Sequence, residues 1–126
     1  MGITWKYVKP LADKDSVKDF LYRYKISLPE DLITVLVEYN GGRPENREIL
    51  TVDGKEYVFK ALLSYNMGDK ETIHMIYPEL FENTTLYPFA SDAAGNFVCY
   101  DTKAHKYCLY NHETGKAEDI KELHIQ

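Results

Sequence analysis

The side chains best suited to covalent chemistry in this chain are its two cysteines, Cys99 and Cys108, and its four histidines. The histidines are scattered, at His74, His105, His112 and His124. A cysteine nucleophile needs a general base beside it in a pocket, and no pattern in the sequence indicates either one. Neither Cys-x-x-Cys nor His-x-x-x-His spacing occurs, which disfavours a zinc site. We therefore expect no catalytic residue, no metal ligand and no cofactor.

Asp92 and Asn96 also allow a chemical interpretation, in which the carboxyl group is a general acid and the amide helps to hold a metal ion. The alternative is structural. The run Ser91-Asp92-Ala93-Ala94-Gly95 is a cluster of small residues, and Asx side chains in such clusters bond to the backbone of a turn. The residue types favour the structural interpretation, in which the side chains of Asp92 and Asn96 bond to the backbone of a turn.

Four acidic residues are candidates for contacts with a basic partner: Glu79, Glu82, Asp92 and Asp101. The alternative is that these carboxylates form an ordinary solvated face, which requires no partner. The 11 tyrosines are the one excess in the composition. Tyrosine is favoured both in sheets and at interfaces, so this excess agrees with either role.

The composition is that of an ordinary globular protein and argues against several classes. The 126 residues are 44% hydrophobic and 28% charged, so we expect a single domain over 1–126. The net charge of −5 argues against direct binding to nucleic acid, which depends on Lys and Arg contacts to phosphates. No stretch resembles a signal peptide or approaches the roughly 20 apolar residues of a membrane span. These features predict a cytoplasmic protein without membrane contacts.

The stretch Leu86–Asp101 is predicted to form a strand pair in the middle of a sheet. Its two arms are apolar on both faces and flank the small-residue cluster that ends at Gly95. A loop at 102–105 then places Cys99 opposite Cys108, with favourable partner types at the neighbouring positions. Two cysteines in such a pair can have the geometry of a disulfide, but we expect them to stay reduced in the cytoplasm.

Two amphipathic helices precede this sheet. The first begins near Ser16, which with Asp19 resembles a capping box. The second begins at Pro29 and ends at Asn-Gly-Gly, 40–42, where a residue with positive φ can close the last turn. Apolar residues at helical spacing predict one shared buried face: Val17, Phe20, Leu21 and Tyr24 in the first helix, and Leu32, Val35, Leu36 and Tyr39 in the second.

Three shorter elements are expected in the rest of the chain. Asp53-Gly54 is typical of a two-residue hairpin turn of type I′. Asp69 is predicted to cap a short helix that ends before Pro78. The polar end of the chain, 117–126, is expected to form a last contact or a last helix.

Two motifs together resemble the SUKH superfamily, which includes a fungal cell-wall synthesis regulator and many bacterial immunity proteins. The first, Leu28-Pro29-Glu30-Asp31 followed by Tyr39-Asn40-Gly41-Gly42, is similar to the helix signature of that family. The second, the run from Tyr87 to Asn96 followed by Cys99-Tyr100-Asp101, is similar to its central strand pair. The resemblance covers nearly the whole chain in the right order and spacing.

The resemblance implies an α+β fold in which helices pack on one side of a mostly antiparallel sheet. It also implies a function: a non-catalytic, cytoplasmic immunity protein that binds and neutralises a toxin, often a nuclease. Nuclease toxins are commonly basic because they contact phosphates, so the expected partner is a basic toxin domain. A regulatory or scaffold module outside toxin systems is the alternative.

Overall fold

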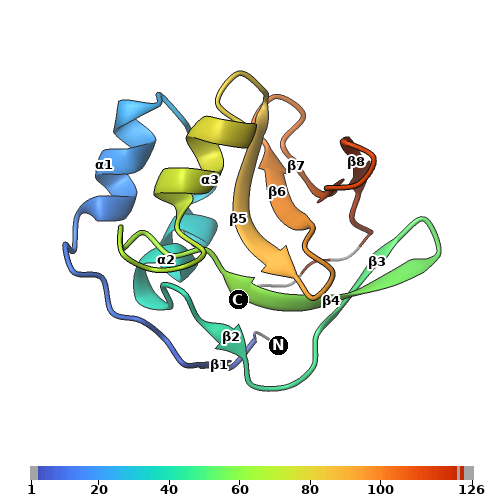
Figure 1. Cartoon of the computed structure of the whole chain (residues 1–126), viewed down its shortest axis with the longest axis horizontal. Helices are drawn as coiled ribbons and strands as arrows, with labels where there is room; N and C mark the ends of the chain where they lie inside the picture. Colours follow the sequence, from blue (N-terminus) through green and yellow to red (C-terminus); the bar gives the residue numbers. More distant parts are fainter. Residues whose placement is uncertain (1–2, 122, 124–126) are drawn as a thin grey trace.

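The computed structural model describes residues 3–121 and 123, and it consists of three helices, a six-stranded sheet and a two-stranded sheet. Figure 1 shows the helices gathered beside the curled larger sheet. The elements in chain order are β1 Trp5–Lys6, α1 Ser16–Arg23, α2 Glu30–Glu38, β2 Arg43–Pro44, β3 Ile49–Val52, β4 Lys55–Leu62, α3 Ile73–Leu80, β5 Leu86–Asp92, β6 Phe97–Asp101, β7 Lys106–Asn111 and β8 Lys116–Asp119. The predicted α+β class is confirmed.

The larger sheet runs in the order β3-β4-β5-β6-β7-β8, and every neighbouring pair is antiparallel. β5 and β6 occupy its middle, as the apolar stretch Leu86–Asp101 predicts. Both faces of these two strands are covered, which is why both arms of the stretch are apolar on both faces. A register shift between Pro88 and Ala90 accommodates the proline, which has no N–H to donate to the ladder.

Two predicted strand registers are confirmed. Cys99 lies opposite Cys108 on β6 and β7, and the flanking pairs follow the predicted order. Asp53 and Gly54 join β3 to β4 with φ of 48° and 77°, the two positive values that a type I′ turn requires. Local turn chemistry therefore sets the β3–β4 hairpin, and the cross-strand partner types agree with the β6–β7 register.

The predicted helix faces form the core against the sheet. Val17, Phe20 and Leu21 of α1 are buried, and so are three residues of α2: Leu32, Val35 and Leu36. Much of the tyrosine excess is also structural. Tyr65 and Tyr87 are 2% and 1% exposed, and their hydroxyl groups hydrogen-bond each other at 2.5 Å.

Two helix caps differ from the prediction. The N-cap of α1 is Asp15 without a side-chain cap bond, so the capping box at Ser16 is wrong. The N-cap of α3 is Thr72, whose hydroxyl oxygen accepts a hydrogen bond from the backbone of His74, so Asp69 is not the cap. Asp69 instead accepts a hydrogen bond from the Ser64 hydroxyl, and Thr72, which forms a β-bridge with Ser64, has the extended backbone of an N-cap residue.

α3 also continues through Pro78 to Leu80, although the sequence predicts an end before the proline. Tyr77 and Phe81, on either side of it, are 5% and 1% exposed. Pro78 costs the helix one backbone hydrogen bond and crowds the carbonyl of the preceding turn, and burial of the two flanking rings offsets this cost.

Part of the segment expected to form a last contact or a last helix is a strand instead, because Lys116–Asp119 forms the edge strand β8 beside β7. All four residues are exposed, so no alternation of apolar and polar residues marks the strand. Ile120 follows it and is buried, which confirms the expected last contact. The remainder of the predicted terminal segment, 122 and 124–126 with His124, lies outside the described residues.

Candidate functional site

The Asn40-Gly41-Gly42 turn after α2 holds the N-terminal arm against the body of the protein. Asn40 is 1% exposed. Its side-chain nitrogen donates hydrogen bonds to the carbonyl oxygen of Lys9 at 2.9 Å and to the hydroxyl of Ser64 at 3.1 Å. Its side-chain oxygen accepts one from the backbone N–H of Tyr65 at 2.8 Å. Three segments distant in sequence therefore meet at one amide.

The two glycines of this turn are required for different reasons. Gly41 has a φ of 67°, which confirms the predicted left-handed cap. The side chain of Lys9 passes over Gly41, and its Cδ lies 3.3 Å from where a Cβ atom would be. A Cβ atom on Gly42 would lie 2.8 Å from the carbonyl oxygen of Tyr39, too close for any side chain. The turn thus brings Lys9 to the edge of a pocket.

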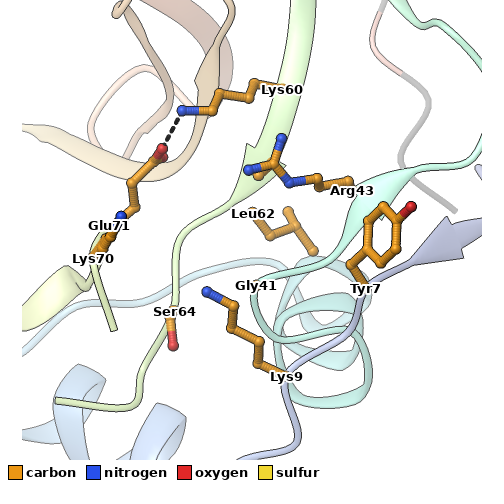
Figure 2. A pocket seen from close by; sticks show the side chains of 10 residues that line it. Tyr7, Lys9, Gly41, Arg43, Lys60, Leu62, Ser64, Lys70 and Glu71 are labelled. Carbon is orange, nitrogen blue, oxygen red and sulfur yellow. Dashed lines mark hydrogen bonds and ion pairs between the residues drawn. The ribbon is translucent and has the colours of Figure 1, made fainter. Parts of the chain in front are cut away.

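That pocket has a volume of about 310 Å³ and is lined largely by polar and charged residues. Figure 2 shows Lys60 and Glu71 joined at one side, and Arg43 and Lys9 directed toward the same hollow from two other segments. Its lining residues are Tyr7, Lys9, Gly41, Arg43, Lys60, Ala61, Leu62, Ser64, Lys70 and Glu71.

Among the described residues that line the pocket, Glu71 is the only acidic one, and two donors hold it in place. Lys60 donates to one carboxylate oxygen at 2.5 Å, and the Ser91 hydroxyl donates to the other at 2.6 Å. Burial by itself raises the pKa of Glu71, but these hydrogen bonds and the charges of Lys60 and Arg43 outweigh it. The net pKa is lowered, so this carboxylate is ionised at neutral pH.

The other three cations of the lining, Lys9, Arg43 and Lys70, form no ion pair within the described residues. The pocket therefore concentrates four of the chain's 15 Lys and Arg around one carboxylate, in a protein of net charge −5. Such an arrangement can bind an anionic group. No local run of basic residues in the sequence predicts this site, because its cations come from separate segments.

The acidic candidates do not form one patch. Glu79 and Glu82 are exposed near the end of α3. Asp101 lies opposite Leu86 at the start of β5, and its carboxylate accepts backbone hydrogen bonds from Lys103 and Ala104. These donors, that of Ala104 most of all, lower the pKa of Asp101.

Asp92 lies at the opposite end of β5 and is 1% exposed, so its inclusion among the partner-binding residues is wrong. Its carboxylate accepts hydrogen bonds from the backbone of Ala94 and from the backbone and side chain of Asn96. Asn96 in turn accepts from the backbone N–H of His112 at 3.1 Å. The alternative interpretation of Asp92 and Asn96, as residues that bond the backbone of a turn, is confirmed.

The two thiols are packed as apolar side chains. Cys99 and Cys108 are free cysteines that are 0% and 3% exposed. Burial raises the pKa of Cys99, and burial with the nearby charges of Asp101 and Asp119 raises the pKa of Cys108 to about 11. A reactive cysteine needs the opposite shift, because the thiolate is the nucleophile.

The part of the chain that the structure describes contains neither a metal-ligand cluster nor a membrane-spanning helix. Over 3–121 and 123, no group of three or more His, Cys, Asp or Glu side chains could hold a metal ion. Within the same part of the chain, no helix has the length and apolar character needed to cross a membrane.

Comparison with known proteins agrees with the fold. The SUKH_6 family model, described as SMI1-KNR4 cell-wall, matches residues 14–122. That range includes the helix signature, the Asn-Gly-Gly turn and the central strand pair. No curated protein and no solved structure matches the chain. Because the family model covers most of the chain, the protein belongs to the SMI1-KNR4 (SUKH) family.

Proposed function

We propose that this protein is an immunity protein that binds a cognate toxin in the cytoplasm and neutralises it without turnover. The observation that carries the proposal is membership of the SUKH family over residues 14–122. Two features of the structure support it. The thiols are buried and protonated at neutral pH, and Asp92 is fully engaged in its turn. The thiols and Asp92 therefore both have structural roles in the packed protein.

A basic toxin domain is the proposed partner, often a nuclease, because nucleases contact phosphates with Lys and Arg. The exposed carboxylates of Glu79 and Glu82 and the partly exposed carboxylate of Asp101 would face it. Complementary charge of this kind mainly speeds association and selects the partner. The tight contact itself would come from apolar and aromatic anchors.

The test of this function is co-expression with the toxin domain encoded by a neighbouring gene. We expect rescue of growth and co-purification of the two proteins near one to one. Cys99→Ser should keep the rescue, because no thiolate takes part. Inhibition at far below equimolar amounts, or rescue lost in a folded Cys99→Ser protein, would point to an enzyme.

The charged surface can be tested separately. Glu79→Gln with Glu82→Gln should slow association with the toxin domain by about twofold to tenfold at low salt, because each charge contributes to steering. The matched control is Glu56→Gln with Glu118→Gln, two exposed residues of β4 and β8, which changes the net charge equally. Equal effects of the two pairs would mean that this surface has no specific role.

A regulatory or scaffold module is the second candidate function. The description of the family model refers to the cell wall, which favours a role outside toxin systems. If no neighbouring gene product binds the protein, this candidate replaces the first.

A further inference from the structure

The pocket between the N-terminal arm, β2, β4 and the segment before α3 has a charge opposite to that of the whole protein. Its rim carries Lys9, Arg43 and Lys70, none of which has an ion-pair partner among the residues that the structure describes. We propose that this pocket is a docking site for an acidic segment of a protein partner. The inference does not require that partner to be a toxin.

Charge complementarity is the first reason for an acidic occupant. The net charge of −5 repels a polyanion from most of the surface, so the local excess of cations gives one preferred place to bind. Figure 2 shows the charged ends of Arg43 and Lys9 directed toward the hollow from two different segments. Carboxylates on successive residues of one segment could meet both of them.

The exposure of the cations favours a segment over a small free anion. Lys9, Arg43 and Lys70 are exposed, and a single solvated ion pair contributes little. Several such ion pairs made by one peptide segment strengthen binding together. Once the first pair has formed, the others form at a high effective concentration. Tyr7, which is 71% exposed at the same rim, offers an aromatic surface to the rest of the segment.

Glu71 allows a prediction of the direction in which a change of charge alters anion binding. Its ionised carboxylate lies in the pocket and forms an ion pair with Lys60, so it repels an anion that enters the pocket. Removing this charge while keeping the shape should therefore strengthen binding. Glutamine has the same shape: its carbonyl oxygen can accept the hydrogen bond from Lys60 while its NH₂ group donates to the Ser91 hydroxyl, which makes Glu71→Gln the appropriate variant.

The experiment measures binding of a fluorescein-labelled, capped hexaglutamate peptide to the full chain by fluorescence anisotropy, with a hexaglutamine peptide as the neutral control. Lys9→Ala with Arg43→Ala should weaken binding by about fourfold or more, since each exposed pair contributes a factor of about two to five. Glu71→Gln should strengthen it by about twofold or more. The matched control is Lys18→Ala with Lys103→Ala, which changes the net charge equally at exposed sites outside the pocket lining.

Each of the following results would overturn the proposal. The first is no preference for hexaglutamate over hexaglutamine, and the second is equal weakening in the pocket and control variants. The third is inorganic phosphate that binds at the pocket more tightly than the peptide, because the occupant would then be a small anion. Toxin binding that survives in the pocket variants while hexaglutamate fails to bind would overturn this inference and leave the proposed function intact. Circular dichroism confirms that each variant is folded.

Discussion

The side-chain amide of Asn40 donates a hydrogen bond to the carbonyl oxygen of Lys9 at 2.9 Å, and the backbone of Lys9 donates one to the carbonyl oxygen of Asn40 at 2.8 Å. This reciprocal pair joins the N-terminal arm to the end of α2. It also places the Lys9 side chain over Gly41, at the rim of the pocket lined by Lys9, Arg43, Lys60 and Lys70, the basic pocket.

Asn40→Ala should lower the free energy of unfolding by about 1–3 kcal/mol, because it leaves the buried backbone N–H of Tyr65 without its acceptor. Urea denaturation measures the change. Asn46→Ala, at an exposed position, is the control and should change stability by less than about 0.5 kcal/mol. Similar midpoints for the two variants would show that the amide does not hold the arm.

Gly42→Ala should destabilise the protein by about 1–3 kcal/mol, because the new Cβ atom would lie 2.8 Å from the carbonyl oxygen of Tyr39. Gly68→Ala is the matched control, since no heavy atom lies within 4 Å of its ideal Cβ position. It should change the free energy of unfolding by less than about 1 kcal/mol in either direction. Thermal denaturation of both variants measures the change in stability. Equal losses of stability in the two variants would contradict the steric explanation.

Phe20→Ala should cost about 2–5 kcal/mol, and Leu36→Ala should cost a similar amount, because both side chains are buried. The Phe20 ring contacts several aromatic rings, including that of Tyr24 at a centroid distance of 4.8 Å. The exposed Lys18→Ala is the reference, with an expected change below about 0.5 kcal/mol. A thermal midpoint for either core variant as high as that of the reference would mean that the helix faces are assigned wrongly.

The buried thiols predict a loss of stability at alkaline pH. In the unfolded chain a thiol ionises near pH 8.5. Burial raises the pKa of Cys99, and burial and nearby carboxylates raise that of Cys108 to about 11. Because the unfolded state loses protons first, the contribution is fully present below about pH 8.5 and disappears as the pH rises toward 11.

Urea denaturation over this pH range measures that effect. The variant Cys99→Ala with Cys108→Ala should have a smaller loss of unfolding free energy between about pH 8.5 and 10 than the natural protein. Identical pH profiles would exclude the thiols as the source. A thiol assay on unfolded, unreduced protein should detect both cysteines as unbridged, and a reading near zero would contradict that.

Much of the fold could be predicted because its signals are local. The Asp53-Gly54 turn, the Cys99–Cys108 register and the Gly41 cap each depend on residues close together in sequence. Helix faces follow from apolar spacing for the same reason. The two motifs that resemble the SUKH family lie within the range that its model matches.

Other features depended on contacts that no local pattern records. Asp92 resembles an exposed turn carboxylate in the sequence, but packing of β5 in the middle of the sheet buries it. Thr72 rather than Asp69 caps α3 because Ser64 pairs with Thr72 across the intervening loop. The strand β8 forms because β7 offers it an edge, although its own residues are all exposed.

The basic pocket is the clearest case of a feature that tertiary structure alone decided. Lys9, Arg43, Lys60 and Lys70 are spread over four segments, and the sequence shows only a net acidic chain in which they are dispersed. The hydrogen bonds of Asn40, the one from Leu62 to the carbonyl oxygen of Gly42, and the bridge between Ser64 and Thr72 bring those segments together. The sequence by itself determined the Asp53-Gly54 turn, the registers of two hairpins and the apolar helix faces, because these depend on neighbouring residues. The convergence of charge depends on distant ones, and only the packed chain brings them together.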